Sequence, residues 1–176
     1  MSKVHQVRRA SACIRPLAAG FALAAGLVLA SESASAATVT DTMAVTVTVQ
    51  SACVVSASPL AFGTYSPVSG TNLDATTTLN VTCTQGTAYN VGLSAGGGAG
   101  ATTTVRKLTS SGRTLNYALY SDSGRTTNWG NTVSTDTVSG TAGLTATAYT
   151  VYGRIPANQN TAAGAYTDSV TVTVTY

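Results

Sequence analysis

Large apolar residues alternate with polar residues along the stretch TVTDTMAVTVTVQ, residues 38–50. The large apolar residues all fall at odd positions: Val39, Met43, Val45, Val47 and Val49. Threonines hold most of the even positions, and Asp41 is the one charged residue in the apolar row. A period of two predicts a β-strand with one buried face. No tight turn follows to fold this strand back as a hairpin, so the pattern leaves open which core the strand completes.

The rest of the chain repeats this signal in shorter pieces. β-branched and aromatic residues dominate after residue 37, and Gly, Ser, Asn and Asp interrupt them every ten residues or so. This pattern predicts a single all-β sandwich domain without helices. A flexible hairpin connection is expected at Ser94–Gly100, which is rich in glycine. The expected strands are Val54–Tyr65, Thr76–Cys83, Tyr89–Leu93, Ala101–Leu108, Thr114–Tyr120, Thr145–Ile155 and Tyr166–Tyr176.

The last expected strand has one apolar face and ends with the chain. Its inward residues are Val170, Val172, Val174 and Tyr176. We expect no later strand to return beside it. The chain is therefore predicted to begin with a strand that has no local partner and to end with a strand that has none downstream.

Residues 1–36 are predicted to be a secretory signal peptide. A basic start precedes the apolar stretch Leu17–Ala30, and small residues favour cleavage between Ala36 and Ala37. The apolar stretch is too short to span a membrane comfortably, so we expect export without membrane insertion. The predicted organisation is a signal peptide (1–36), an N-terminal extension (37–50) and one sandwich domain (51–176).

The positive charge of the chain lies in the predicted signal. The sequence has nine Lys or Arg residues and six Asp or Glu residues, which gives a net charge of +3. Four of the basic residues and one acidic residue lie in residues 1–36, which leaves five of each sign in the predicted mature chain. A neutral mature chain gives no reason to expect nucleic acid or an anionic membrane as a partner.

Histidine and glutamate also occur only in the predicted signal, as His5 and Glu32. The mature chain therefore lacks the histidine of Ser-His-Asp and Cys-His catalysis and has no imidazole for a metal. A pair of carboxylates could arise only if folding brought two of the scattered aspartates together, and turn positions are the favoured interpretation. We expect no enzyme activity, no metal and no cofactor.

Two cysteines remain after the predicted cleavage, Cys53 and Cys83. A lone pair in an exported chain predicts a disulfide bond. A metal site with two thiolates is the disfavoured alternative, because other soft or imidazole ligands are missing.

Several aromatic and basic residues could either form a binding site or have a purely structural role. Trp129 suits either a sugar-stacking platform or an aromatic at the sandwich edge, and we favour the edge. Arg106, Lys107 and Arg113 are predicted to be solvated at the ends of a hairpin, because three cations do not make a nucleic-acid site. Five tyrosines could line a ligand face, but we expect rings in the core and hydroxyls toward water. They are Tyr89, Tyr117, Tyr120, Tyr149 and Tyr152.

Four segments, taken in order, resemble the spore coat protein U family, which includes the Csu-type pilins of the archaic chaperone–usher pathway. They are Phe62–Tyr65, Leu79–Gly96, Arg106–Gly130 and Tyr152–Tyr176. The resemblance implies an incomplete immunoglobulin-like β-sandwich that a donor strand from a neighbouring subunit completes. It also implies a location on the cell surface, reached through the periplasm, and no catalysis. The implied partners are identical or related pilin subunits, a periplasmic chaperone and an outer-membrane usher.

The resemblance assigns roles to the two strands without partners. The N-terminal extension becomes the donor, with Val39, Met43, Val45, Val47 and Val49 entering a neighbour's groove. Asp41 is expected at the mouth of that groove. The acceptor strand beside the groove contributes Val170, Val172, Val174 and Tyr176. From the pattern alone, the extension could equally fold back and complete its own domain.

The function expected from these features is that of a structural fibre subunit that supports adhesion or biofilm formation. The alternative is a secreted spore-coat or extracellular-matrix protein of the same fold without an usher-built pilus. A glycan-binding tip adhesin is disfavoured, because one domain leaves no room for a separate receptor domain.

Overall fold

The structure is a computed structural model, and it describes residues 36–176. Most of the predicted signal peptide lies outside the described residues. Contacts within the chain divide it into two units, Met1–Val45 and Thr46–Tyr176. Residues 36–52 form neither helix nor strand, so the alternating stretch is not a strand in the isolated chain. The physical reason is that a β-strand needs a partner to satisfy its backbone groups.

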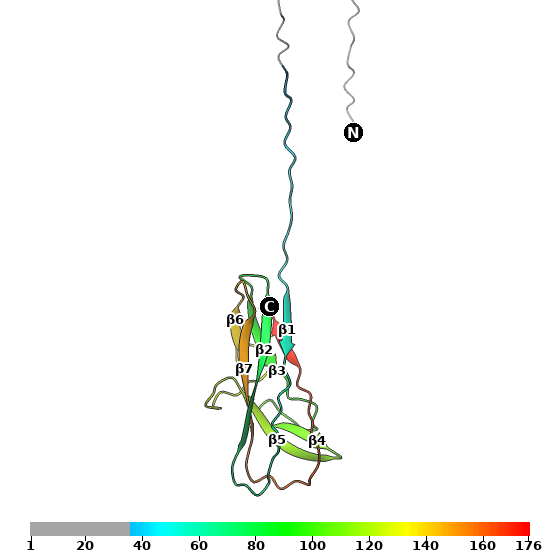
Figure 1. The fold of residues 1–176 in the computed structure, drawn as a ribbon, viewed down its shortest axis with the longest axis vertical. Coiled ribbons are helices and arrows are strands. Elements are labelled where there is room, and N and C mark those ends of the chain that lie inside the picture. Colours follow the sequence, from blue (N-terminus) through cyan, green and yellow to red (C-terminus); the bar gives the residue numbers. More distant parts are fainter. Residues whose placement is uncertain (1–35) are drawn as a thin grey trace, which may run out of the picture. The chain divides into compact units, whose positions relative to one another are not determined.

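Eight strands form two sheets in the second unit (Figure 1). They are β1 (Cys53–Ala57), β2 (Leu73–Cys83), β3 (Ala88–Leu93), β4 (Arg106–Ser110), β5 (Arg113–Tyr120), β6 (Val138–Thr141), β7 (Thr147–Ile155) and β8 (Val172–Thr175). The five-stranded sheet has the order β1-β2-β7-β5-β4, and the three-stranded sheet has the order β6-β3-β8. All of these pairings are antiparallel. The predicted all-β fold class is confirmed, and residues 36–176 contain no helix that could cross a membrane.

The centre of the five-stranded sheet follows directly from alternation in the sequence. β2 pairs with β7 from Leu73 opposite Ile155 to Val81 opposite Thr147. Leu79, Val81 and Ile155 point into the core and are at most 2 % exposed. Residues of the other parity, Thr76, Thr78, Thr82 and Thr150, are exposed on the outer face. A sheet with one buried face requires this pattern, because successive side chains point to opposite faces.

The core lies between the two sheets and draws on both. Burying each of its large side chains contributes about 1.5–3 kcal/mol to folding. The buried members are Leu79, Val81, Tyr89, Val91, Leu93, Leu115, Tyr117, Leu119, Trp129, Ala142, Val151 and Ile155.

Several predicted strand boundaries were wrong, each for a local reason. The first strand ends at Ala57 instead of Tyr65, because Pro59 follows and lacks a backbone donor. The last strand pairs regularly only from Val172 to Thr175. β6 was missed altogether, because its sequence VSGT is short and has a single large apolar residue.

The glycine-rich stretch Ser94–Gly100 is not a hairpin connection. It begins the crossover that carries the chain from β3 in the three-stranded sheet to β4 in the five-stranded sheet. Close packing explains its composition, because a Cβ atom at Gly98 would lie 2.6 Å from the carbonyl oxygen of Lys107. Glycine is therefore needed here to let two backbones approach each other.

Arg106 was predicted to be solvated, and this prediction was wrong: its exposed fraction is 0 %. Its guanidinium donates hydrogen bonds to four main-chain carbonyls. The Nε atom reaches Ser94 O at 2.8 Å, and Nη1 reaches Thr103 O at 2.6 Å. The Nη2 atom reaches Leu93 O at 2.9 Å and Trp129 O at 2.7 Å. Burial lowers the pKa of Arg106 from its ordinary value, and the four carbonyls compensate the buried charge.

Trp129 is a core residue and not an edge aromatic or a sugar platform, because only 1 % of it is exposed. Its indole Nε1 donates to the carbonyl of Val91 at 2.8 Å. The tyrosine hydroxyls in the core also find protein partners instead of water. The hydroxyls of Tyr89 and Tyr149 lie 2.9 Å apart and share a hydrogen bond.

Candidate functional site

β1 is one edge strand of the five-stranded sheet, β8 is one edge strand of the three-stranded sheet, and the two lie near each other (Figure 1). β1 pairs only with β2, and β8 pairs only with β3. In the described part of the chain, the outer edge of each therefore presents backbone N–H and C=O groups without a strand partner. Such an edge is a template for another strand.

A groove of about 320 Å³ opens where β1 ends and β8 begins. One wall consists of Ala57–Leu60 together with Phe62, and the other wall carries Val170 and Val172. The floor is built from residues that also pack in the core: Leu79, Leu93, Leu108, Tyr117, Leu119 and Val151. The apolar interior of the sandwich is thus accessible from this groove.

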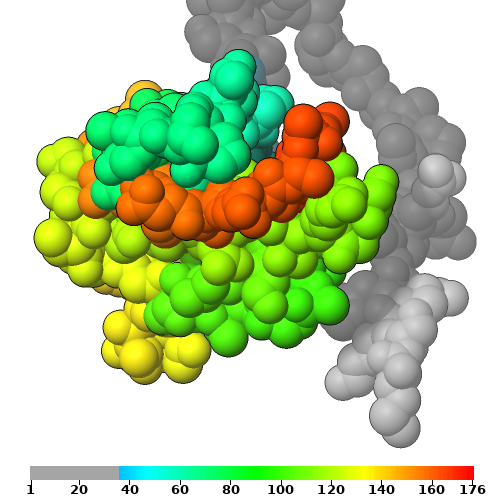
Figure 2. Space-filling model, turned by 90° about the horizontal axis from the view of Figure 1, so that it is seen from below, coloured from blue at the N-terminus to red at the C-terminus, as the bar shows by residue number. Residues whose placement is uncertain are grey.

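The groove continues into a second hollow of about 770 Å³. Leu60, Phe62 and Leu108 line both. The remaining wall of the second hollow includes Ala61–Tyr65 and Thr161–Tyr166. Figure 2 looks at this end of the domain and shows the orange residues after β7 between the teal-to-green residues after β1 and the yellow-green residues of β4 and β5. Together the two hollows make an elongated, mostly apolar depression.

The predicted acceptor residues occupy different places. Val170 and Val172 line the groove. Val174 packs against the core without lining the groove, and Tyr176 is 60 % exposed beside β3 and β6. Sequence reasoning missed the opposite wall around Leu60 and Phe62. The signal that could have found this wall is the pair of large apolar residues directly after Pro59.

Among the described residues, Asp168 is the only charged one that lines the groove. Its carboxylate accepts hydrogen bonds from the Tyr117 hydroxyl and from the backbone N–H of Gly97, both at 2.7 Å, and from its neighbour Ser169 at 2.8 Å. Burial, and then the hydrogen bond to Asp168, raise the pKa of Tyr117 above its ordinary value. This carboxylate ties the segment before β8 to the crossover and to β5. Residues 36–176 hold no group of three acidic, histidine or cysteine side chains placed to bind a metal.

The apolar row of the N-terminal extension is exposed in the isolated chain. The exposed fractions of its side chains lie between 76 % and 93 %. They belong to Val39, Met43, Val45, Val47 and Val49. Ala36 and Ala37, at the predicted cleavage site, are exposed as well. A continuous row of large apolar side chains in water marks a segment that gains free energy when it is buried.

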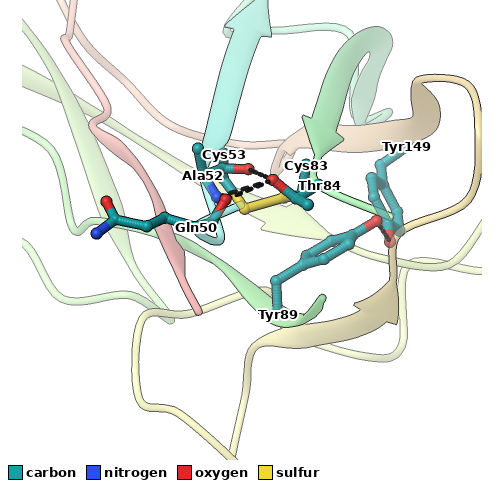
Figure 3. The surroundings of a disulfide bond; sticks show 7 residues. All are labelled: Gln50, Ala52, Cys53, Cys83, Thr84, Tyr89 and Tyr149. Carbon is teal, nitrogen blue, oxygen red and sulfur yellow. Dashed lines mark hydrogen bonds between the residues drawn. A yellow bond between two sulfur atoms is a disulfide. The ribbon is translucent and has the colours of Figure 1, made fainter. Parts of the chain in front are cut away.

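A disulfide bond joins Cys53 to Cys83 (Figure 3). The two residues are directly opposite in the pairing of β1 with β2, with Cα atoms 4.0 Å apart. The sequence separation is 30 residues, for which loop closure contributes about 3–4 kcal/mol. Because β1 leads into one wall of the groove, the bond fastens that wall to the five-stranded sheet.

Comparison with known proteins agrees with this architecture. "Protein U" of Myxococcus xanthus is 35% identical over 168 residues, which cover 87% of this chain and 93% of that protein. The fold is shared with a protein of known structure. That protein was crystallised in the CsuC–CsuE chaperone–tip adhesion subunit pre-assembly complex, from archaic chaperone–usher Csu pili of Acinetobacter baumannii. That match has a TM-score of 0.56 and 24% identity over 73% of this chain, and the chain spans 41% of that protein's length. Residues 39–173 match the Spore Coat Protein U domain, and the chain therefore belongs to that family.

Proposed function

We propose that this protein is a structural subunit of a secreted surface fibre that polymerises by donor-strand exchange. In the fibre, residues 37–49 of one copy occupy the groove between β1 and β8 of the next. One observation carries this proposal: the same chain has an exposed strand-like apolar row and an open apolar groove between unpaired edges. Addition of a strand from a neighbouring chain is an established way to complete such a sheet.

The two surfaces complement each other chemically. Burial of four Val or Met side chains contributes on the order of 6–12 kcal/mol before ordering costs, and pairing with the free edge of β8 adds main-chain hydrogen bonds. Asp41 would lie at the groove's mouth, where its charge stays hydrated. The contact joins different surfaces head to tail, and contacts of this kind propagate into a filament unless they close a ring.

The partners follow from the exposed groove. Before assembly, an open edge above an apolar floor favours aggregation, so a periplasmic chaperone would cover it during export. An outer-membrane usher would then exchange the chaperone for the extension of the next subunit. The fold similarity to a protein crystallised as a chaperone–subunit complex supports this route. The resulting fibre would lie outside the cell and serve adhesion or biofilm formation.

A second candidate is a spore-coat or matrix protein that assembles by the same strand exchange without an usher. The family's description and the similarity to "Protein U" along almost its whole length favour this possibility. The two candidates share the donor and the groove. They differ in whether export yields ordered fibres only when a chaperone and an usher are present.

The decisive experiment places single substitutions on one or the other face of the extension. The full chain is used, and it is exported with its own N-terminal segment. Samples are run on denaturing gels with and without heating. We expect a ladder of multimers that collapses on heating. Val47→Asp places a charge in the apolar row and should abolish the ladder, whereas the matched control Thr46→Asp places the same charge on the other face and should preserve it.

A different result would assign the extension to its own domain. If the unchanged protein stays monomeric and removal of residues 38–49 unfolds it, the extension completes its own sandwich. The fibre mechanism would then be wrong, and a self-contained coat protein would replace it.

A further inference from the structure

The connector between the extension and the domain is short. The apolar row ends at Val49 and β1 begins at Cys53, so only Gln50–Ala52 lie between them. A free linker of three residues reaches roughly 10 Å and allows many orientations of the parts it joins. The freedom of this connector therefore depends on whether the domain holds it.

Thr84 holds the connector at both of its ends (Figure 3). The backbone N–H of Ala52 donates to Thr84 Oγ1 at 3.1 Å, and this hydroxyl donates to the carbonyl of Gln50 at 3.2 Å. The backbone N–H of Thr84 donates to the carbonyl of Ala52 at 2.9 Å. The threonine hydroxyl thus uses both its donor and its acceptor capacity on the connector.

Thr84 itself belongs to a well-anchored part of the domain. It follows Cys83, which the disulfide joins to β1. The turn after it closes with a hydrogen bond from Thr87 N to Thr84 O at 3.1 Å. Gly86, which has a φ of 79°, donates to the carbonyl of Ala142, and Ala142 donates back to Thr87, both at 2.9 Å. Because Ala142 is a core residue, the turn is fixed to the body of the sandwich.

We propose that Thr84 is a positioning residue for the joint between consecutive subunits of the fibre. This inference rests on the proposed strand exchange. In the fibre, the chain up to Val49 would lie in one subunit's groove, and the chain from Gln50 onward is bonded to the next domain. The hydrogen bonds to Gln50 and Ala52 begin directly after Val49, so the hydroxyl of Thr84 limits the angle between neighbouring domains.

The test compares fibres of the unchanged protein with fibres of Thr84→Val and Thr84→Ser. Valine has the shape of threonine but neither donates nor accepts a hydrogen bond, whereas serine keeps the hydroxyl. Electron microscopy measures the spread of angles between consecutive subunits and the persistence length. Loss of two hydrogen bonds should shorten the persistence length of Thr84→Val fibres at least about twofold, and Thr84→Ser fibres should match the unchanged ones.

A second measurement examines the connector without fibres. In the monomeric protein, the amide of Ala52 should exchange with solvent at least about tenfold faster in Thr84→Val, because its acceptor is gone. An unchanged thermal midpoint would show that the domain remains folded. Equal angle distributions in Thr84→Val and unchanged fibres would overturn this inference and leave strand exchange intact. Absence of fibres from the unchanged protein would instead overturn the proposed function and, with it, the joint.

Discussion

The crossover from β3 to β4 and the groove between β1 and β8 are two places where the two sheets meet, and their chemistry is opposite. At the crossover, one buried guanidinium satisfies four carbonyls from three segments of the chain. At the groove, two strand edges lack partners in the described chain and the floor is apolar. The carbonyls at the crossover all have a donor, whereas the outer edges of β1 and β8 at the groove lack a strand partner in the described chain. The groove is therefore a local feature and not a sign of a loosely packed domain.

The comparison also separates two kinds of stabilisation. Within residues 36–176, no carboxylate forms an ion pair with the buried Arg106. Burial of an isolated charge is costly unless hydrogen bonds compensate it. Asp168 and Asp136 contribute only a more distant favourable charge. The crossover thus depends on its hydrogen bonds. The groove is lined mostly by apolar side chains, so the proposed insertion of another strand would stabilise it through the hydrophobic effect.

The largest effect is expected at the crossover. Arg106→Met keeps much of the side-chain volume but leaves four carbonyls without their donor, so it should lower the free energy of unfolding by about 3–5 kcal/mol. Arg106→Lys keeps the charge with fewer donors and should be less destabilising. Urea unfolding of the oxidised proteins measures both. A loss below about 1 kcal/mol in Arg106→Met would mean that the crossover is held by packing instead.

A moderate effect is expected at the groove. A chain that lacks residues 38–49 should be stabilised by a synthetic peptide of residues 37–50 added in trans. At a hundredfold excess over its dissociation constant, the peptide should contribute about 2.7 kcal/mol, which raises the melting temperature by roughly 5–15 °C.

The control for this prediction is the same peptide with Val47→Asp, which carries a charge in the apolar row. It should give no stabilisation at the same concentration. Equal shifts with both peptides would show that binding does not use the apolar row. The proposal that the groove is completed by an apolar strand would then be wrong.

The smallest change in the free energy of unfolding is expected on the outer face of the five-stranded sheet. This exposed face is the reference with which the effects at the crossover and at the groove are compared. The Arg154 guanidinium donates two hydrogen bonds of 2.8 Å to Asp74, and Arg125 lies 3.3 Å from the same carboxylate. The hydrogen bond from Arg154 holds the pKa of Asp74 below its ordinary value of 3.8.

A lowered pKa in the folded state means that Asp74 stabilises the fold above about pH 4 and that this contribution is lost as the pH falls through the folded-state pKa. Because the pair is partly exposed, Asp74→Asn should cost under about 1 kcal/mol at pH 7. The difference between Asp74→Asn and the unchanged protein should shrink as the pH falls below about 4 in urea titrations. A difference that stays constant from pH 7 to pH 3 would contradict the assignment.

Much of the sandwich could be predicted from alternation alone. The expected strands at Tyr89–Leu93, Thr114–Tyr120 and Thr145–Ile155 agree with β3, β5 and β7 to within two residues. The extension was expected to be a strand, but it has no strand partner in the isolated chain. Its alternating pattern still specifies a buried face, and the identity of the partner that buries it stays a prediction.

The sequence by itself determined the features that can be read along the chain: the two-residue period, and, after residue 36, the pair of cysteines and the absence of histidine. Only the tertiary structure decided that Arg106 and Trp129 are buried and that the residues around Leu60 form the far wall of the groove. The physical reason is distance along the chain. A cation can be buried only where folding gathers carbonyls from separate segments, and a groove exists only where the edges of two sheets meet.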